Sequence, residues 1–175
     1  MSLEQGDYLI VAEKIVQTLL SDTAPGGLCE ENDPAVKTIE PRIRKESKLY
    51  SRYELPLIGV EVVGKREEPA PSSQLIDKIF ELEFLILCRG GDREAEAERA
   101  KKIAHRLEKV LMEQNYPDKQ FLGLAKEISQ SQGILILKLK ETQFESRFFE
   151  EASGSKPEVA CTVSAELIIP CSRLL

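Results

Sequence analysis

The chain has 175 residues, of which 42% are hydrophobic, and its 24 basic and 30 acidic side chains give a net charge of −6. A chain of this size can bury roughly 70% of the surface that its unfolded form exposes, so we expect one globular domain over residues 1–175. The negative charge disfavours nonspecific binding to nucleic acid, and any DNA contact should be incidental. No apolar run approaches the roughly 20 residues of a membrane span, and the N-terminal residues lack a signal-peptide pattern. We therefore expect a cytoplasmic protein without membrane contact.

The first predicted element is an amphipathic helix from Gln5 to Leu20, in which apolar residues recur every three or four positions. Ala24-Pro25-Gly26-Gly27 follows it with residues that end helices. The segment 22–56 is irregular, with Thr38-Ile39-Glu40 as a candidate short strand. It contains a run of basic residues: Arg42, Arg44, Lys45, Lys48 and Arg52. We expect these residues to form a solvated loop, which is also the best candidate for any contact with DNA.

A pair of strands comes next. Leu57 to Val63 is a predicted short strand, the loop Lys65 to Ser73 follows, and Leu75 to Cys88 is a predicted long strand. One face of the long strand carries Ile76, Phe80, Leu82, Phe84, Ile86 and Cys88. The other face carries Ile79, Glu81, Glu83, Leu85 and Leu87. Since neither face is freely solvated, we expect one face on the helices and the other against a neighbouring subunit or partner. Two glutamates on one sheet face are more typical of ion-paired surface residues than of a catalytic pair.

Gly90-Gly91-Asp92 then leads into a charged amphipathic helix from Arg93 to Asn115. Asp92 is a suitable N-cap, and acidic residues near the start and basic residues later in the helix complement its dipole. The predicted buried stripe is Ala97, Ala100, Ile103, Ala104, Leu107, Val110 and Leu111. Capping by Asp92 places negative charge at the helix start, which argues against an anion site there.

The last third of the chain contains two further predicted strands, Gly133 to Lys140 and Glu158 to Pro170. The intervening segment, 141–157, is expected to be a partly ordered loop or a short helix. Together these elements predict an α+β fold, with an antiparallel, possibly mixed, sheet of four to five strands and two helices packed on one face.

The residue chemistry indicates no catalytic constellation, cofactor site or metal site. Gly59 to Lys65 has the glycine and lysine spacing of a phosphate-binding loop, but Arg66 stands where Ser or Thr is required. The four cysteines have no zinc-ligand spacing, and at Cys88 and Cys161 they occupy apolar strand positions. His105 is the single histidine and lacks a nucleophile motif. We therefore expect a protein that is not an enzyme.

The order of elements resembles the tail terminator proteins of long-tailed bacteriophages and related prophage tail proteins. The resemblance rests on the N-terminal helix, the segment Leu55-Pro-Leu-Ile-Gly-Val-Glu-Val62, the long strand with its small-residue turn, the helix opening Asp92-Arg-Glu-Ala-Glu-Ala-Glu-Arg-Ala100, and the closing strands. It implies a non-enzymatic ring, usually of six copies, that caps the tail tube, meets the head–tail connector and becomes part of the virion tail. The alternative is a cytoplasmic homo-oligomeric adaptor or small-ligand-binding module that works as a dimer.

Overall fold

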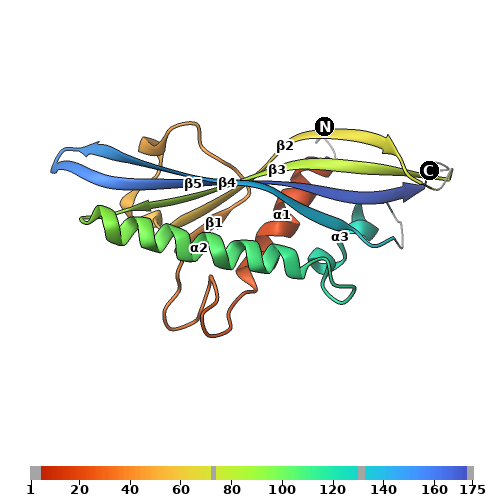
Figure 1. Cartoon of the computed structure of the whole chain (residues 1–175), viewed down its shortest axis with the longest axis horizontal. Coiled ribbons are helices and arrows are strands. Elements are labelled where there is room, and N and C mark those ends of the chain that lie inside the picture. The colour runs from red at the N-terminus through yellow and green to blue at the C-terminus, as the bar shows by residue number, and fades with distance from the viewer. Residues whose placement is uncertain (1–4, 72–73, 130–132, 173–175) are drawn as a thin grey trace.

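A computed structural model describes residues 5–71, 74–129 and 133–172. In these residues a mixed sheet packs against α-helices on one face (Figure 1). The strands are β1 (Thr38–Glu40), β2 (Leu57–Pro69), β3 (Leu75–Arg89), β4 (Ile136–Glu151) and β5 (Gly154–Ser172), and the helices are α1 (Asp7–Leu20), α2 (Arg93–Glu113) and α3 (Gln120–Ser129). This confirms the predicted α+β class. None of these helices is both long and apolar enough to cross a membrane.

The five strands have the order β1-β2-β3-β5-β4. β1 runs parallel to β2 over three residue pairs, and the other neighbours are antiparallel. β3 therefore lies between two strands over Ile76 to Leu87. β4 forms one edge, and β1 covers only the start of β2 at the other edge.

The main core lies between the helices and one face of the sheet. On β3 it contains Phe80, Leu82, Phe84, Ile86 and Cys88, the residues that alternation assigns to one face. α2 contributes most of its predicted stripe, and Leu107 is fully buried. Both the helix-facing side of β3 and the buried stripe of α2 are thus as the sequence predicts.

The side chain of Glu96 folds back over the turn between β3 and α2. A Cβ atom at Gly90 would lie 2.2 Å from Oε1 of Glu96. Asp92 caps the helix as expected, because its carboxylate accepts a hydrogen bond of 3.1 Å from the Glu94 amide. A larger residue at position 90 would therefore require the end of the Glu96 side chain to move.

The helix count and the β2–β3 connection differ from the prediction. α3 was not predicted, and its assigned range includes non-helical backbone at Phe121, Leu122 and Gly123, so only its second half is regular helix. β2 continues to Pro69, so most of the predicted loop from Lys65 is strand, while residues 72 and 73 lie outside the described residues. Pairing with β3 holds this polar part of β2 in the sheet.

The prediction of a loop or short helix over 141–157 is wrong. Residues Glu141–Glu151 belong to β4, and Gly154 begins β5, so the two strands form a long hairpin. Most side chains of this part of β4 are exposed, and it therefore lacks the apolar alternation that marks a half-buried strand. The strand conformation of this segment depends on its pairing with β5 and not on a local apolar pattern.

Candidate functional site

The segment 41–56 crosses the face of the sheet opposite to the helices, and we call it the arch (Figure 1). Tyr50 and Leu55 of the arch pack on Leu57, Leu87 and Ala160, which lie side by side on β2, β3 and β5. These residues form a second, smaller apolar cluster. The outer face of the sheet is therefore partly covered by the chain itself.

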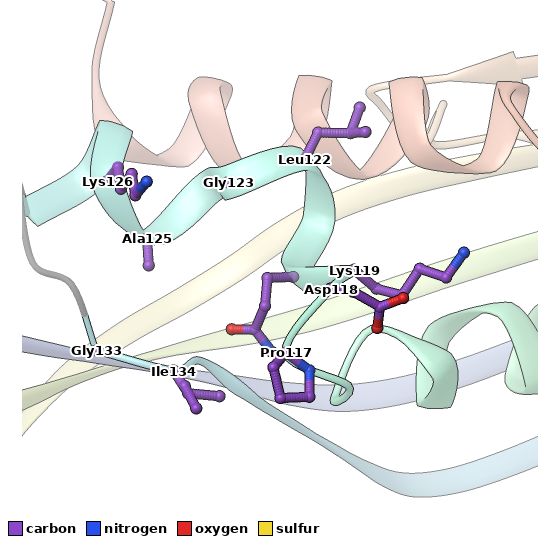
Figure 2. A pocket seen from close by; sticks show the side chains of 10 residues that line it. Pro117, Asp118, Lys119, Leu122, Gly123, Ala125, Lys126, Gly133 and Ile134 are labelled. Atoms are coloured by element: carbon purple, nitrogen blue, oxygen red, sulfur yellow. The ribbon is translucent and has the colours of Figure 1, made fainter.

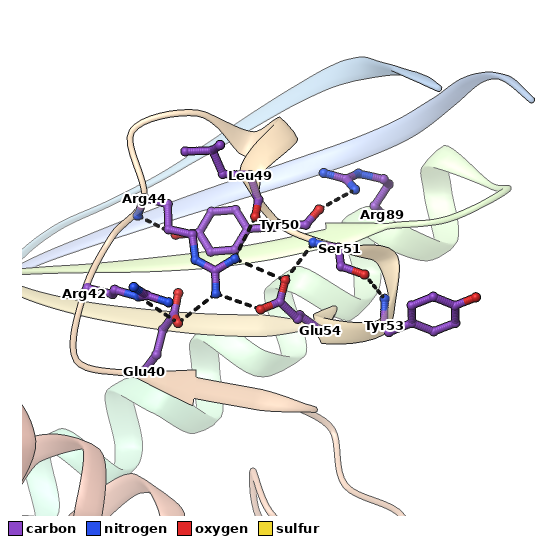
Figure 3. A network of polar contacts seen from close by, with 9 residues as sticks. All are labelled: Glu40, Arg42, Arg44, Leu49, Tyr50, Ser51, Tyr53, Glu54 and Arg89. Atoms are coloured by element: carbon purple, nitrogen blue, oxygen red, sulfur yellow. Dashed lines mark hydrogen bonds and ion pairs between the residues drawn. The ribbon is translucent and has the colours of Figure 1, made fainter. Parts of the chain in front are cut away.

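Arg44 holds the arch in shape (Figure 3). Its guanidinium donates to Oε1 of Glu54 at 2.7 Å, to Oε2 of Glu40 at 3.1 Å and to the carbonyl oxygen of Leu49 at 2.7 Å. It also stacks on the Tyr50 ring, 4.7 Å from the centroid. The hydrogen bond from Arg44 lowers the pKa of the Glu54 carboxyl, and the two carboxylates raise the pKa of Arg44. Arg44 therefore holds Glu40, Leu49 and Glu54 together through hydrogen bonds.

A buried ion pair fixes the arch to the sheet. The side chain of Arg89 on β3 is 3% exposed and that of Glu158 on β5 is 0% exposed, with 2.7 Å between Nη2 and Oε2. Arg89 also donates to the carbonyl oxygens of Ser47 and Tyr50 in the arch, at 3.1 and 3.3 Å. Its guanidinium lies 3.5 Å from the centroid of the Phe149 ring on β4. Arch, sheet and the β4–β5 hairpin therefore meet at one residue.

The basic residues of the predicted loop are mostly bound to other side chains of the same segment. Arg42 and Arg44 pair with Glu40, Lys48 pairs with Glu46, and Arg52 donates to the hydroxyl of Tyr53. Among the described ion pairs none involves Lys45. Most of the basic side chains in the run thus form ion pairs with nearby carboxylates. These partners, at positions 40, 46 and 54, are not part of the pattern of basic residues from which the loop was predicted.

The predicted interface on the second face of β3 divides into covered and open parts. Leu87 is fully buried under the arch, and Leu85 packs against the same cluster. Ile79 is also buried, between Arg66 of β2 and Ile168 of β5 in the sheet register. The two glutamates, Glu81 and Glu83, remain nearest the surface. The face is therefore no continuous apolar surface, because the chain itself buries Leu87 fully and Leu85 in part.

The open part of the outer face is rich in carboxylates. Glu81 lies opposite Glu166 in the β3–β5 register, and Arg66 bridges them with Nη–Oε distances of 3.1 and 3.0 Å. Lys140 reaches Glu166 at 3.3 Å. Burial alone would raise the pKa of Glu166, but hydrogen bonds from Arg66 and Lys140 outweigh it and lower the pKa. The cluster is a set of partly exposed ion pairs, each of which contributes little to stability.

The edge strand β4 is the most prominent open feature of the sheet. No strand among the described residues pairs with its outer side. A bulge between Leu139 and Glu141 interrupts its first part, and the ladder is regular from Glu141 to Glu151. The hairpin continues past the last β3–β5 pair, Arg89 with Glu158. We call this projecting part, residues 148–157, the arm.

A groove beside α3 lies at the other end of the molecule from the arm (Figures 1 and 2). Its volume is about 380 Å³, and its lining includes Pro117, Lys119, Leu122, Lys126 and Ile134. The backbone beside it has positive φ at three non-glycine residues, Gln120, Phe121 and Leu122, with values of 54°, 49° and 56°. Sequence reasoning missed this groove, because nothing in Gln-Phe-Leu indicates a left-handed turn.

Side-chain hydrogen bonds hold the left-handed turn in place. Gln114 accepts from the Phe121 amide at 2.9 Å, and Gln120 accepts from the Leu135 amide at 2.7 Å. Phe121 is fully buried in the main core. Each left-handed residue costs about 1–2 kcal/mol, so these contacts must outweigh several kcal/mol of strain. As a result Leu122 is directed outward and is 55% exposed.

The remaining candidate residues lie apart. Cys88 and Cys161 are buried, and burial raises the pKa of each thiol to about 12. His105 is exposed on α2. The Gly59–Lys65 segment lies within β2 and not in a loop before a helix, so its phosphate-loop spacing is coincidental. Among the described residues no group of three or more His, Cys, Asp or Glu side chains is placed to hold a metal ion.

In comparisons with known proteins, no protein-family model matches the chain and no curated protein matches its sequence.

Proposed function

We propose that the protein is a non-enzymatic structural subunit that assembles into a closed ring, as the phage tail terminators that it resembles do. In that role the ring, usually of six copies in the resembled family, would cap the end of a tail tube and offer its other side to the head–tail connector. The observation that carries the proposal is the open β4 edge with its projecting arm.

An exposed edge strand presents backbone N–H and C=O groups that can pair with another chain. Proteins often protect such edges with bulges and lysines, and the first part of β4 has both, namely the Leu139/Glu141 bulge with Lys138 and Lys140. The second part, Glu141–Glu151, is regular and longer than the mean strand of about 5–6 residues. This part is suited to pairing with a second chain.

The two edges of the sheet favour a ring over a symmetric pair. β1 covers only Leu57–Gly59, so the rest of β2 is open on the side opposite to β4. The alternation of strand directions places β2 and β4 in opposite senses. A copy placed beside β4 in the same orientation therefore meets it with an antiparallel strand. Such a contact joins two different surfaces, and repeating it gives a ring if the rotation closes.

A dimeric adaptor remains the second candidate, and one observation favours it. The regular part of β4 could pair with β4 of one other copy about a two-fold axis, which would use the same edge and leave β2 open. The two candidates differ in mass. Light scattering should give a ring-sized species for the first and a dimer for the second.

Proline substitutions test the role of the β4 edge. Neighbouring residues of an antiparallel edge strand direct their N–H groups alternately inward and outward. Of Glu145→Pro and Ser146→Pro, one should therefore break the β4–β5 ladder and the other should remove an outward donor. The variant that keeps the wild-type urea midpoint should lose the assembled species and fail to stop tail-tube growth. A folded variant of this kind that assembles as the wild type does would contradict the proposal.

A further inference from the structure

Two neighbouring phenylalanines at the arm differ in their surroundings. Phe149 lies on the outer side of the sheet, where the Arg89 guanidinium covers its ring. Phe148 is on the helix side of the sheet and is 64% exposed. Phe144 shares that side, opposite Cys161, and is also exposed. Within the described chain, then, Phe149 is packed and Phe148 is not.

One carboxylate lies on the same side of the arm as Phe148. Glu150 is exposed, and its carboxylate accepts from the Ser155 hydroxyl and from no described cation. The side chain of Glu145 is 71% exposed, and its nearest described cation is Arg147 at 3.9 Å. Arg147 itself is held by Glu158 at 2.6 Å. Glu145 lies on the other side of the strand, with Arg147 and Phe149, so the carboxylate beside the exposed Phe148 ring that forms no ion pair among the described residues is that of Glu150.

The groove beside α3 has the complementary composition. Leu122 and Ile134 are exposed apolar side chains in its lining, and Pro117 lies beside Ile134 in the view of Figure 2. Lys119 and Lys126 are exposed, and neither forms an ion pair with any carboxylate of the described residues. Asp118 contributes one opposing charge. The groove is therefore apolar with an excess of positive charge.

We propose that Phe148 of one copy docks into the α3 groove of the next copy. An apolar ring meets the apolar residues of the groove, and the carboxylate of Glu150, on the same side of β4 as Phe148, meets the ammonium groups of Lys119 and Lys126. Arm and groove lie at opposite ends of the long axis, so the contact is head-to-tail and can close a ring (Figure 1). When the strands are tilted relative to the ring axis, each copy is shifted along the strand direction relative to the next copy. This shift brings the arm of one copy closer to the groove of its neighbour. The inference rests on the proposed self-association.

The left-handed turn supplies a test that separates fold from association. Leu122→Gly places glycine at a φ of 56°, which glycine adopts without steric cost, so the urea midpoint should stay the same or rise. If Leu122 lines the docking groove, the same variant should raise the dissociation constant of assembly about tenfold or more. Phe148→Ala should behave in the same way, because its ring is exposed in the monomer.

Phe149→Ala is the matched control on the arm. It removes the ring that covers Arg89, so it should lower the urea midpoint, in contrast to Phe148→Ala. A Phe148→Ala or Leu122→Gly variant that assembles with wild-type strength would overturn the docking proposal. If the wild type still forms rings in that case, the proposed function stands without it. A wild type that stays monomeric at every concentration would overturn both.

Disulfide crosslinking tests which surfaces meet. In a Cys29→Ala background, which removes the least buried thiol, the Glu150→Cys/Lys126→Cys variant keeps Phe148 and Leu122 and should form oligomer ladders on oxidation. Each single variant carries one accessible thiol and should stop at dimers. Absence of a ladder from a double variant that still has the mass of the wild-type assembly would contradict the arm-to-groove contact.

Discussion

Replacing Arg89 by alanine should cost more stability than any other single change at the surface of the sheet. The variant would leave the Glu158 carboxylate, which is fully buried, with Arg147 as its remaining cation at 2.6 Å. Breaking a buried ion pair from one side costs about 3–5 kcal/mol. The arch would also lose the donors to the carbonyl oxygens of Ser47 and Tyr50. We expect a total of about 4 kcal/mol, a large part of the roughly 5–15 kcal/mol of a typical domain.

Urea unfolding followed by circular dichroism measures this loss. With a slope of about 2 kcal/mol per molar urea, the midpoint of Arg89→Ala should fall by roughly 2 M. Arg147→Ala is the control, because Arg147 contacts the same carboxylate but its side chain is 38% exposed, and it should cost only about 1 kcal/mol. The double variant Arg89→Met/Glu158→Leu should recover most of the loss, since it leaves no buried unpaired charge. Equal midpoints for wild type and Arg89→Ala would refute this account of how the arch is held.

Three further predictions concern the core and its ionisable groups. Leu107→Asp should lower stability by about 3–5 kcal/mol, because it exchanges a fully buried apolar side chain for a charge; unchanged thermal unfolding would remove α2 from the core. Burial alone would raise the pKa of Asp22, but hydrogen bonds from Arg106 and from the Leu28 amide outweigh it and lower the pKa. Its stabilising effect should thus be present above the unfolded pKa of about 3.9 and be lost as pH falls below it, so Asp22→Asn should flatten the loss of stability between about pH 4 and pH 2. Cys88 and Cys161, with pKa values raised to about 12, should resist alkylation by iodoacetamide in the native protein at pH 8, and rapid labelling of either, read by peptide mass, would show that α2 opens easily.

The parts of the fold that could be predicted are those with a buried face. β3 alternates on both sides and α2 has a continuous apolar stripe, so their positions follow from periodicity. The Asp92 cap follows from local chemistry. The regular part of β4 has mostly exposed side chains, and its strand conformation depends on pairing with β5, which a local pattern does not contain.

The candidate site depended still more on tertiary structure. The run from Arg42 to Arg52 reads as a free basic loop, but Glu40 and Glu54 are folded onto Arg44 from either side. Leu85 and Leu87 read as an open apolar face, but the arch covers Leu87, and Leu85 is half-buried against the same cluster. The turn at Leu122 is held by Gln114 and by the burial of Phe121, against the preference of each residue. In each case a specific side-chain contact, made within ten residues along the chain at Arg44 and Phe121 and across the sheet at Leu87, decided the outcome.

The most direct test of the central claim is the mass of the purified chain in solution, measured by sedimentation velocity over a wide range of concentration. The proposed ring predicts one closed species whose mass is a fixed multiple, greater than two, of the 19.7 kDa chain and does not grow further with concentration. A protein that remains a monomer or stops at a dimer at the highest concentration would contradict the ring.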